Sequence, residues 1–94
     1  MSLTFEWDLR KARLNLAKHG VGFEEASTIF DDLLSLTIPD PDHSLAEERY
    51  ITLGRAFTSK LFVVVHTDRS DNIRIISARR ASRRERKFYE ETIE

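Results

Sequence analysis

The chain has 94 residues, 33% of them charged, a formal net charge of −1 at pH 7 and no cysteine. This length predicts one domain over residues 1–94 with a modest core, and the absence of cysteine excludes disulfides, thiol catalysis and thiolate metal sites. The longest apolar run, Leu61–Val65, is too short to span a bilayer and the N-terminus lacks a signal-peptide core, so we expect a soluble, cytoplasmic protein without membrane contact.

The N-terminal third predicts a short strand followed by two helices. Thr4–Trp7 has strand composition, and Asp8 is suited to cap a helix that runs through Lys18 and stops at Gly20. A second helix is expected over about Phe23–Phe30, where apolar residues recur at helical spacing. One face of the first helix is apolar and consists of Leu9, Ala12 and Leu16.

The middle of the chain predicts four strands rich in Ile, Val, Leu and Thr, separated by turn-like segments. They are expected at Leu33–Ile38, Arg49–Arg55, Leu61–Thr67 and Ile73–Ala78. Short connections favour an antiparallel meander. Together with a C-terminal helix this order describes an α+β fold: two N-terminal helices, an antiparallel four-stranded meander sheet and a C-terminal helix, with the helices on one face of the sheet.

The C-terminal helix begins in an arginine-rich segment. Ser82 and Glu85 fit a capping box, which places the helix start at Ser82. Cations in a first turn oppose the helix dipole, so their concentration here favours an anion bound at the helix start. Pairs spaced i,i+4, such as Arg86 with Glu90, leave open the alternative of an ordinary solvated helix face.

Charge is segregated along the chain, although the net charge is small. The segment Val21–Glu48 holds eight acids and no Lys or Arg, whereas Arg49–Tyr89 holds eleven basic residues and three acids. Such a division predicts a polyanionic partner for the basic half.

Pairing the last three strands through their short loops predicts which side chains share a face of the sheet. One face becomes apolar and is the expected core, with the rows Ile51, Val65, Ile75 and Leu53, Val63, Ser77. The opposite face then carries a phenol, an imidazole and a guanidinium side by side, from Tyr50, His66 and Arg74. These groups suit phosphodiester chemistry, and a one-residue slip would exchange the two faces.

Three segments, taken together, resemble a known family. The stretches FEWDLRKARLNLAKHGVGFEEASTIFDD, EERYITLGRA and IRIISARRASRRERKFYEE occur in this order. They are similar to BrnT, the toxin of the BrnT/BrnA type II toxin–antitoxin systems. The resemblance covers nearly the whole chain and is weakest over Leu33–Leu45 and Phe57–Lys60. Its specificity lies in the combination of KHG, EERY and RIISAR, and the one local departure is Gly22, where the motif HGVSFEEA has serine.

The resemblance implies a RelE-like fold and a metal-independent endoribonuclease that needs no cofactor and arrests growth. It also implies two partners, an RNA substrate and a BrnA-like antitoxin with a ribbon–helix–helix domain. That antitoxin would neutralise the toxin, and operator DNA would be bound only through it.

Cleavage of RNA without a metal needs a base, an acid and cations around the phosphorane. We expect His66 or Tyr50 to transfer the proton, with Glu48 as a further candidate, because imidazole titrates nearest neutrality. Three arginines are expected to hold the scissile phosphate, namely Arg49, Arg74 and Arg79. Lys18 and His19 match the family's KHG motif and form a second cluster. The expected RNA-binding residues are Arg80, Arg83, Arg84, Arg86 and Lys87.

Each candidate has a structural alternative. His19 is suited to interact with carbonyls at a helix C-terminus, and His66 to be an ordinary strand residue. His43 is expected in a loop with Asx-type turns and not in a metal site. Phe57 is the aromatic residue expected to stack on RNA, whereas core positions are expected for Trp7, Phe23, Phe30, Phe62 and Phe88. For the whole chain the alternative is a non-catalytic nucleic-acid-binding or regulatory module that uses the basic helix for phosphate contacts.

Overall fold

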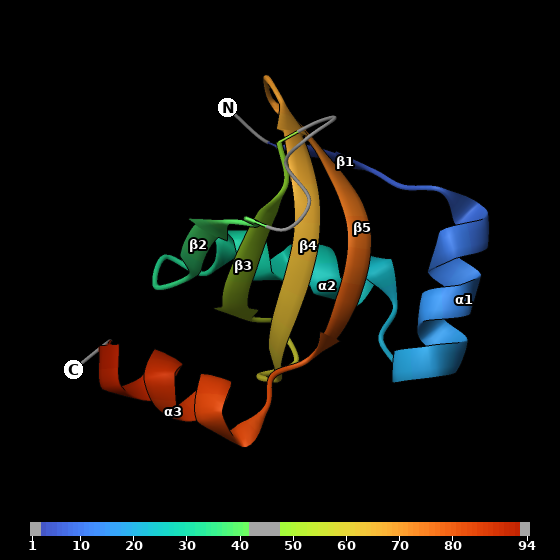
Figure 1. Ribbon diagram of the computed structural model, residues 1–94. Helices are drawn as coiled ribbons and strands as arrows, with labels where there is room; N and C mark the ends of the chain where they lie inside the picture. The colour runs from blue at the N-terminus through green and yellow to red at the C-terminus, as the bar shows by residue number, and fades with distance from the viewer. Residues whose placement is uncertain (1–2, 42–47, 93–94) are drawn as a thin grey trace.

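The computed structural model describes residues 3–41 and 48–92 (Figure 1). In this part of the chain the elements follow one another as β1 (Thr4–Glu6), α1 (Leu9–His19), α2 (Phe23–Ser27), the 3₁₀ helix η1 (Thr28–Asp31), β2 (Leu36–Pro39), β3 (Tyr50–Arg55), β4 (Leu61–Arg69), β5 (Asn72–Arg80) and α3 (Arg83–Thr92). None of these helices is both long and apolar enough to cross a bilayer. The α+β class is confirmed.

The sheet is mixed and has five strands in the order β1-β5-β4-β3-β2. Strands β2 to β5 form the predicted antiparallel meander, but β1 adds to β5 in parallel, with Phe5 opposite Ile73. The four antiparallel strands are thus confirmed, but the expectation that they form the whole sheet was wrong, because β1 adds a fifth strand in parallel. Parallel strands need a long connection, and β1 and β5 have one, because all the elements from α1 to β4 lie between them in the chain.

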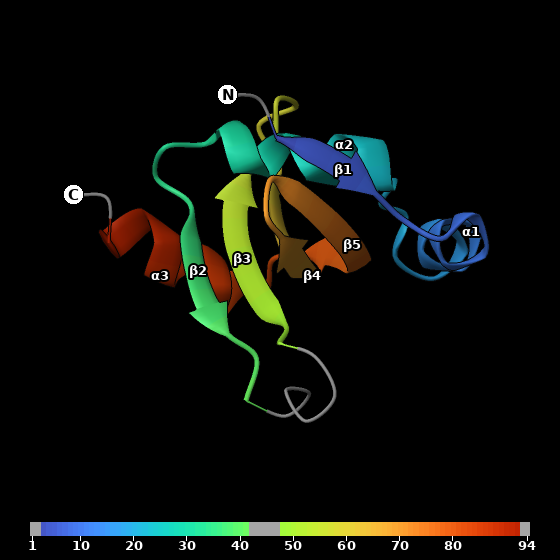
Figure 2. The same ribbon diagram turned by 90° about the horizontal axis from the view of Figure 1, so that it is seen from above.

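Helices cover both faces of the sheet, not one face as expected. Figure 1 shows α2 behind the strands, α1 beside the edge formed by β5, and α3 near the ends of β3 and β5. The view from above places α2 and α3 on opposite sides (Figure 2). We call the two surfaces the α2 face, with Thr52, Val64 and His66, and the α3 face, with Leu53, Val63 and Val65.

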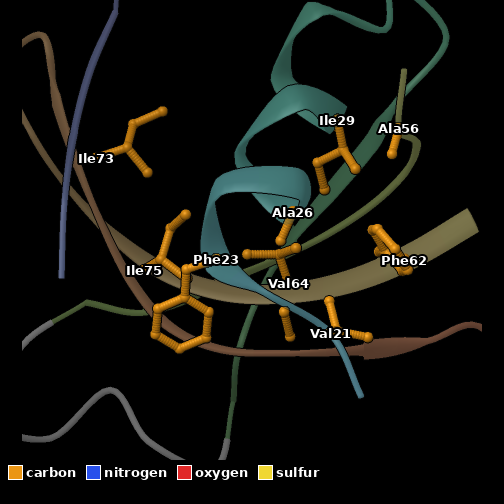
Figure 3. Packing of buried hydrophobic residues seen from close by; sticks show 10 residues of the cluster. Val21, Phe23, Ala26, Ile29, Ala56, Phe62, Val64, Ile73 and Ile75 are labelled. Carbon is orange, nitrogen blue, oxygen red and sulfur yellow. The ribbon is translucent and has the colours of Figure 1, made fainter. Parts of the chain in front are cut away.

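The main core lies on the α2 face. Figure 3 shows side chains of α2 and η1 directed at those of β4 and β5, and the buried cluster consists of Val21, Phe23, Ala26, Ile29, Ala56, Phe62, Val64, Ile73, Ile75 and Ala78. The predicted core face, with Ile51 and Val65, is the α3 face, where both of these residues are only half-buried. The sequence could not separate the faces because Leu61–Val65 is apolar at every position.

A smaller cluster on the α3 face holds α3 in place. It contains Leu53, Leu61, Val63 and Tyr89. The Tyr89 hydroxyl donates to Asp32 at 2.5 Å, and the backbone N–H of Arg55 donates to the same carboxylate at 2.9 Å. Burial raises the pKa of Asp32, but these hydrogen bonds outweigh it and hold the pKa below its usual range.

Local signals fix the helix ends. The Asp8 carboxylate accepts from the N–H groups of Arg10 at 2.8 Å and Lys11 at 3.0 Å. Gly20 ends α1 in the left-handed region at φ 70°, as predicted, and the helix runs to His19, one residue beyond the expected Lys18. The second helix is shorter than predicted: α2 stops at Ser27, where the chain tightens into η1. The Ser27 and Thr28 hydroxyls donate to the carbonyls of Glu24 and Glu25, which competes with a regular helix.

A β-bulge changes the register of the last two strands. Tyr50 pairs with His66, Ile51 with Val65 and Leu53 with Val63, as predicted. Between Val65 and His66, however, the pairing with β5 shifts, so that His66 lies opposite Ile75, Thr67 opposite Arg74 and Val65 opposite Ser77. The predicted rows that end in Ile75 and Ser77 were therefore wrong. So was the row Tyr50, His66, Arg74, because the bulge puts Arg74 on the α3 face and leaves the other two on the α2 face.

The side chain of Asn15 joins α1 to β5. Its amide nitrogen donates to the carbonyls of Ala78 at 2.8 Å and Val21 at 3.0 Å, and its oxygen accepts from the N–H of Ala78 at 3.1 Å. Asn15 is buried in the middle of an otherwise mostly exposed helix. The carboxamide thus pairs with β5 as a neighbouring strand would, beyond the point where β1 has ended.

Replacement of Asn15 by alanine should destabilise the domain. It leaves the buried N–H and C=O of Ala78 without partners, which costs about 2–4 kcal/mol in the free energy of unfolding. Urea unfolding followed by circular dichroism measures this loss. Leu14→Ala, an exposed change on the same helix, is the control and should cost less than about 0.5 kcal/mol. Equal stability of the two variants would contradict the role assigned to Asn15.

Candidate active site

Cationic side chains from two elements gather on the part of the α3 face that α3 leaves open. Figure 1 looks onto this part, with α1 beside β5 and α3 below. We call it the basic face, and its residues are Lys11, Lys18 and His19 of α1 and Arg74 and Arg79 of β5. The register places Arg79 opposite Val63 and Arg74 opposite Thr67, both on this face of the sheet.

Lys18 and His19 lie in the last turn of α1 and are exposed. Together with Lys11 they line a groove whose other wall is Ile76 and Ser77 of β5. Asn15 lies one turn before them and fixes this side of α1 against Ala78. The cap of the helix is the N–H of Gly20, which donates to Leu16 O at 2.9 Å, so the His19 ring is not needed as a cap.

Arg79 is held by the start of α3. Its guanidinium donates to both oxygens of Glu85, at 2.7 and 2.8 Å. Glu85 also accepts from the N–H of Ser82 at 2.8 Å, and the Ser82 hydroxyl accepts from the N–H of Glu85 at 3.1 Å, so the predicted capping box is confirmed. The hydrogen bond with Arg79, helped by Ser82, lowers the pKa of Glu85 to about 2, and Glu85 raises the pKa of Arg79.

Arg74 is also oriented by a carboxylate. It donates to Glu6 at 3.0 Å across the β1–β5 pair, and Asn72 donates to the other oxygen of Glu6. Arg49 is half-buried directly before β3. The arginines expected to hold one phosphate are therefore distributed: Arg79 lies at the α3 end of the sheet, and Arg74 at the β1 end.

Tyr50 and His66 lie together on the α2 face, away from the basic face. His66 is 1% exposed, and its ring packs edge-on against Phe30 at 4.9 Å. Its Nδ1 lies 2.7 Å from Asp68 and its Nε2 2.7 Å from the Thr52 hydroxyl, which in turn lies 2.7 Å from that of Thr37. Burial lowers the pKa of His66, although Asp68 opposes the shift. In this structure the ring is out of reach of a polynucleotide.

Tyr50 interacts with Glu48, which the sequence analysis named as a further candidate for proton transfer. Its hydroxyl donates to Glu48 at 2.7 Å, which raises the pKa of Tyr50. The Tyr50 and His66 rings are 6.0 Å apart. A phenol with a raised pKa is a weaker acid and gives up its proton less readily.

The expected RNA-binding residues surround the start of α3. Arg86 is half-buried, and the others are exposed: Arg80, Arg83, Arg84 and Lys87.

Phe57 is 77% exposed, as a stacking residue would have to be, but it lies at a groove between α1 and α2 and not on the basic face. Trp7, Phe23, Phe30 and Phe62 belong to the main core or pack against it, whereas Phe88 is 60% exposed and its predicted core position was wrong.

Sequence reasoning missed Asn15 and the partner of Arg79. The signal for Asn15 was a polar residue at helical spacing between Ala12 and His19, on the side of the helix next to its apolar face. The signal for the Arg79–Glu85 pair was weaker, because a turn separates the two residues. Among residues 3–41 and 48–92, no group of three His, Cys, Asp or Glu side chains is placed to hold a metal ion. His43 lies outside these residues.

A family model described as "Ribonuclease toxin, BrnT, of type II toxin-antitoxin system" matches residues 7–85. The chain belongs to the BrnT family. The family resemblance of the three sequence segments is thereby confirmed, and with it the assignment as a ribonuclease toxin. No curated protein matches the chain.

A solved structure supports the BrnT fold. The chain is similar to the crystal structure of the Brucella abortus ribonuclease toxin BrnT, with a TM-score of 0.67 and 22% sequence identity over 87% of this chain and 100% of that chain. At this identity the match bears on the fold. It supports the mixed sheet with helices on both faces as the BrnT arrangement.

The burial of His66 predicts that stability falls in weak acid. The pKa of His66 is below its usual 6.5 in the folded chain, so the unfolded chain binds more protons as the pH drops through this range. We expect a lower free energy of unfolding at about pH 5.5 than at about pH 7.5, measured by urea unfolding. His66→Gln cannot titrate and should show a smaller difference. An undiminished difference in this variant would assign the pH dependence to other groups.

Proposed function

We propose that this BrnT-family toxin cuts RNA internally and without a metal, by attack of a 2′-OH on the adjacent phosphate. The observation that supports this most is the gathering of Lys18, His19 and Arg79 around the open part of one sheet face. These side chains supply an imidazole and two kinds of cation, which are the groups that such a reaction needs.

In this reaction the 2′-oxygen forms a bond to phosphorus and the bond to the 5′-oxygen breaks. We assign the transfer of the 2′-OH proton to His19, because it is exposed and next to Lys18, whereas His66 is buried on the other face. Lys18 and Arg79 stabilise the charge of the phosphorane. The products are a 2′,3′-cyclic phosphate and a 5′-hydroxyl, whose oxygen takes a proton from solvent as it leaves.

Arg79 is suited to positioning because Glu85 fixes it. A guanidinium has five donors; Glu85 takes two of them and the Arg80 carbonyl a third at 3.3 Å, so a phosphate can bind the other two N–H groups without breaking the pair with Glu85. Phosphates on either side would then meet Arg74 and Arg49 in one direction and the arginines of the α3 start in the other. This arrangement predicts a strand that runs along the sheet from β1 towards α3.

Membership of a type II system implies a protein antitoxin as the second partner. We propose that it is BrnA-like, with a ribbon–helix–helix domain, and that operator DNA is bound only through it. The relation of the fold to RelE remains a prediction of the sequence resemblance, and action in the cytoplasm remains a prediction from the short apolar runs and the N-terminal sequence.

Incubation of the purified chain with end-labelled RNA in excess EDTA tests the proposal. We expect fragments with 2′,3′-cyclic phosphate and 5′-hydroxyl ends, and a cleavage rate lowered about 10²–10⁴-fold by His19→Ala, the range typical of one acid–base group. Lys18→Ala and Arg79→Ala should also lower the rate. Arg10→Ala, which removes an exposed arginine of α1 outside the basic face, is the matched control and should cleave normally.

Two outcomes would contradict the proposal. Intact RNA in the presence of a folded chain that binds it with a steep salt dependence would favour the non-catalytic binding module. Full activity of His19→Ala together with loss of activity in Tyr50→Phe would move the chemistry to the α2 face.

A further inference from the structure

A second groove lies between α1 and α2, on the side of α1 that faces away from the basic face. It measures about 700 Å³ and its apolar lining consists of Trp7, Leu9, Ala12, Leu16, Phe23 and Phe57. Three of these residues, Leu9, Ala12 and Leu16, make up the apolar helix face predicted from the sequence. Of that face only Ala12 packs against the main core, whereas Leu9 and Leu16 are exposed and form a wall of this groove.

The walls of the groove expose large apolar side chains. Leu9 is 69% exposed, Leu16 is 54% exposed and Phe57 is 77% exposed. The floor is formed by Trp7 and Phe23, whose ring centroids lie 5.9 Å apart in an edge-to-face arrangement. In the middle of α1 the short side chain of Ala12 leaves the groove open. Leu9 and Leu16 are two helical turns apart, roughly 10 Å, so the groove has the length to hold about two turns of a helix. Covering such a surface is a strong driving force for association.

Charges at the rim describe the partner. Glu24 and Glu25 border the groove on the α2 side, and Arg13 borders it on the α1 side. The two carboxylates repel phosphate, so RNA is not a suitable occupant. A protein segment with an apolar stripe, a basic residue towards Glu24 and an acidic residue towards Arg13 matches both the apolar floor and the rim.

We propose that this groove docks an amphipathic helix of the antitoxin. Such a helix would place its apolar side chains among Leu9, Leu16 and Phe57 and its charges against Glu24 and Arg13. The docked helix would contact one side of α1, and Lys18 and His19 lie on the other side. Antitoxin and RNA would therefore bind opposite sides of one helix. The inference rests on family membership for the existence of an antitoxin, and on the proposed active site only for this last relation.

The test measures the affinity of the cognate antitoxin for variants of the full chain by isothermal titration calorimetry. Leu16→Glu and Phe57→Glu should each weaken binding at least about 30-fold, the effect of losing one central apolar contact. Glu24→Lys should weaken binding as well. Leu33→Glu, at a residue that is 98% exposed and outside the groove, is the matched control and should bind like the wild type.

Cleavage of RNA in EDTA by the same variants, measured without antitoxin, separates this inference from the proposed function. Unchanged cleavage shows that the groove variants are folded. If Leu16→Glu or Phe57→Glu lowers the unfolding temperature so that the chain does not stay folded, Leu9→Glu is measured in its place. Wild-type antitoxin affinity in folded Leu16→Glu and Phe57→Glu would overturn the inference. It would also be overturned if these variants only dissociated a dimer of the free chain, because a second copy would then be the occupant. Absence of RNA cleavage by the wild type would count against the proposed function alone.

Discussion

The carboxamide of Asn15 holds α1 against the edge of β5, and the arrangement of the basic face depends on this contact. Strand β1 covers only the first part of that edge, at Asn72–Arg74. Further along, Asn15 takes the place of a strand by pairing with both backbone groups of Ala78. Because Lys18 and His19 follow one turn later, and Ser77 and Arg79 flank Ala78, a single buried side chain brings the end of α1 next to the cations of β5.

The bulge in β4–β5 divides the polar residues between the two faces of the sheet. On the α2 face, His66 is buried beneath Phe30 in a chain of hydrogen bonds from Asp68 to Thr37, which suits a neutral imidazole that stabilises the fold. On the α3 face, Arg74 and Arg79 are fixed by carboxylates but remain accessible. A sheet with helices on both faces can thus bury one face from solvent and leave part of the other face accessible to a ligand.

Sequence reasoning succeeded where the signal is local. Asp8, Gly20 and the Ser82–Glu85 box act within one helical turn, and their predicted roles are confirmed. The β3–β4 register followed from a short connection, but the β4–β5 register failed because a β-bulge between Val65 and His66 shifts the pairing. The core face was misassigned because Leu61–Val65 is apolar at every position. Of the candidate site, Lys18 and His19 came from family resemblance. The spacing of Asn15 beside the apolar helix face is visible in the sequence, but the identity of its distant partner, Ala78, is not.

The location of the RNA-binding surface is the claim on which the proposed chemistry rests, and chemical-shift mapping tests it most directly. The ¹⁵N-labelled chain would be titrated with an RNA oligonucleotide carrying a 2′-deoxy residue, which can bind but cannot be cleaved. Binding to the basic face predicts shifts at Lys18, His19, Ser77 and Arg79 and none at Thr52 or His66. Shifts confined to Tyr50, Thr52 and His66 would place the substrate on the α2 face and contradict the assignment of the site.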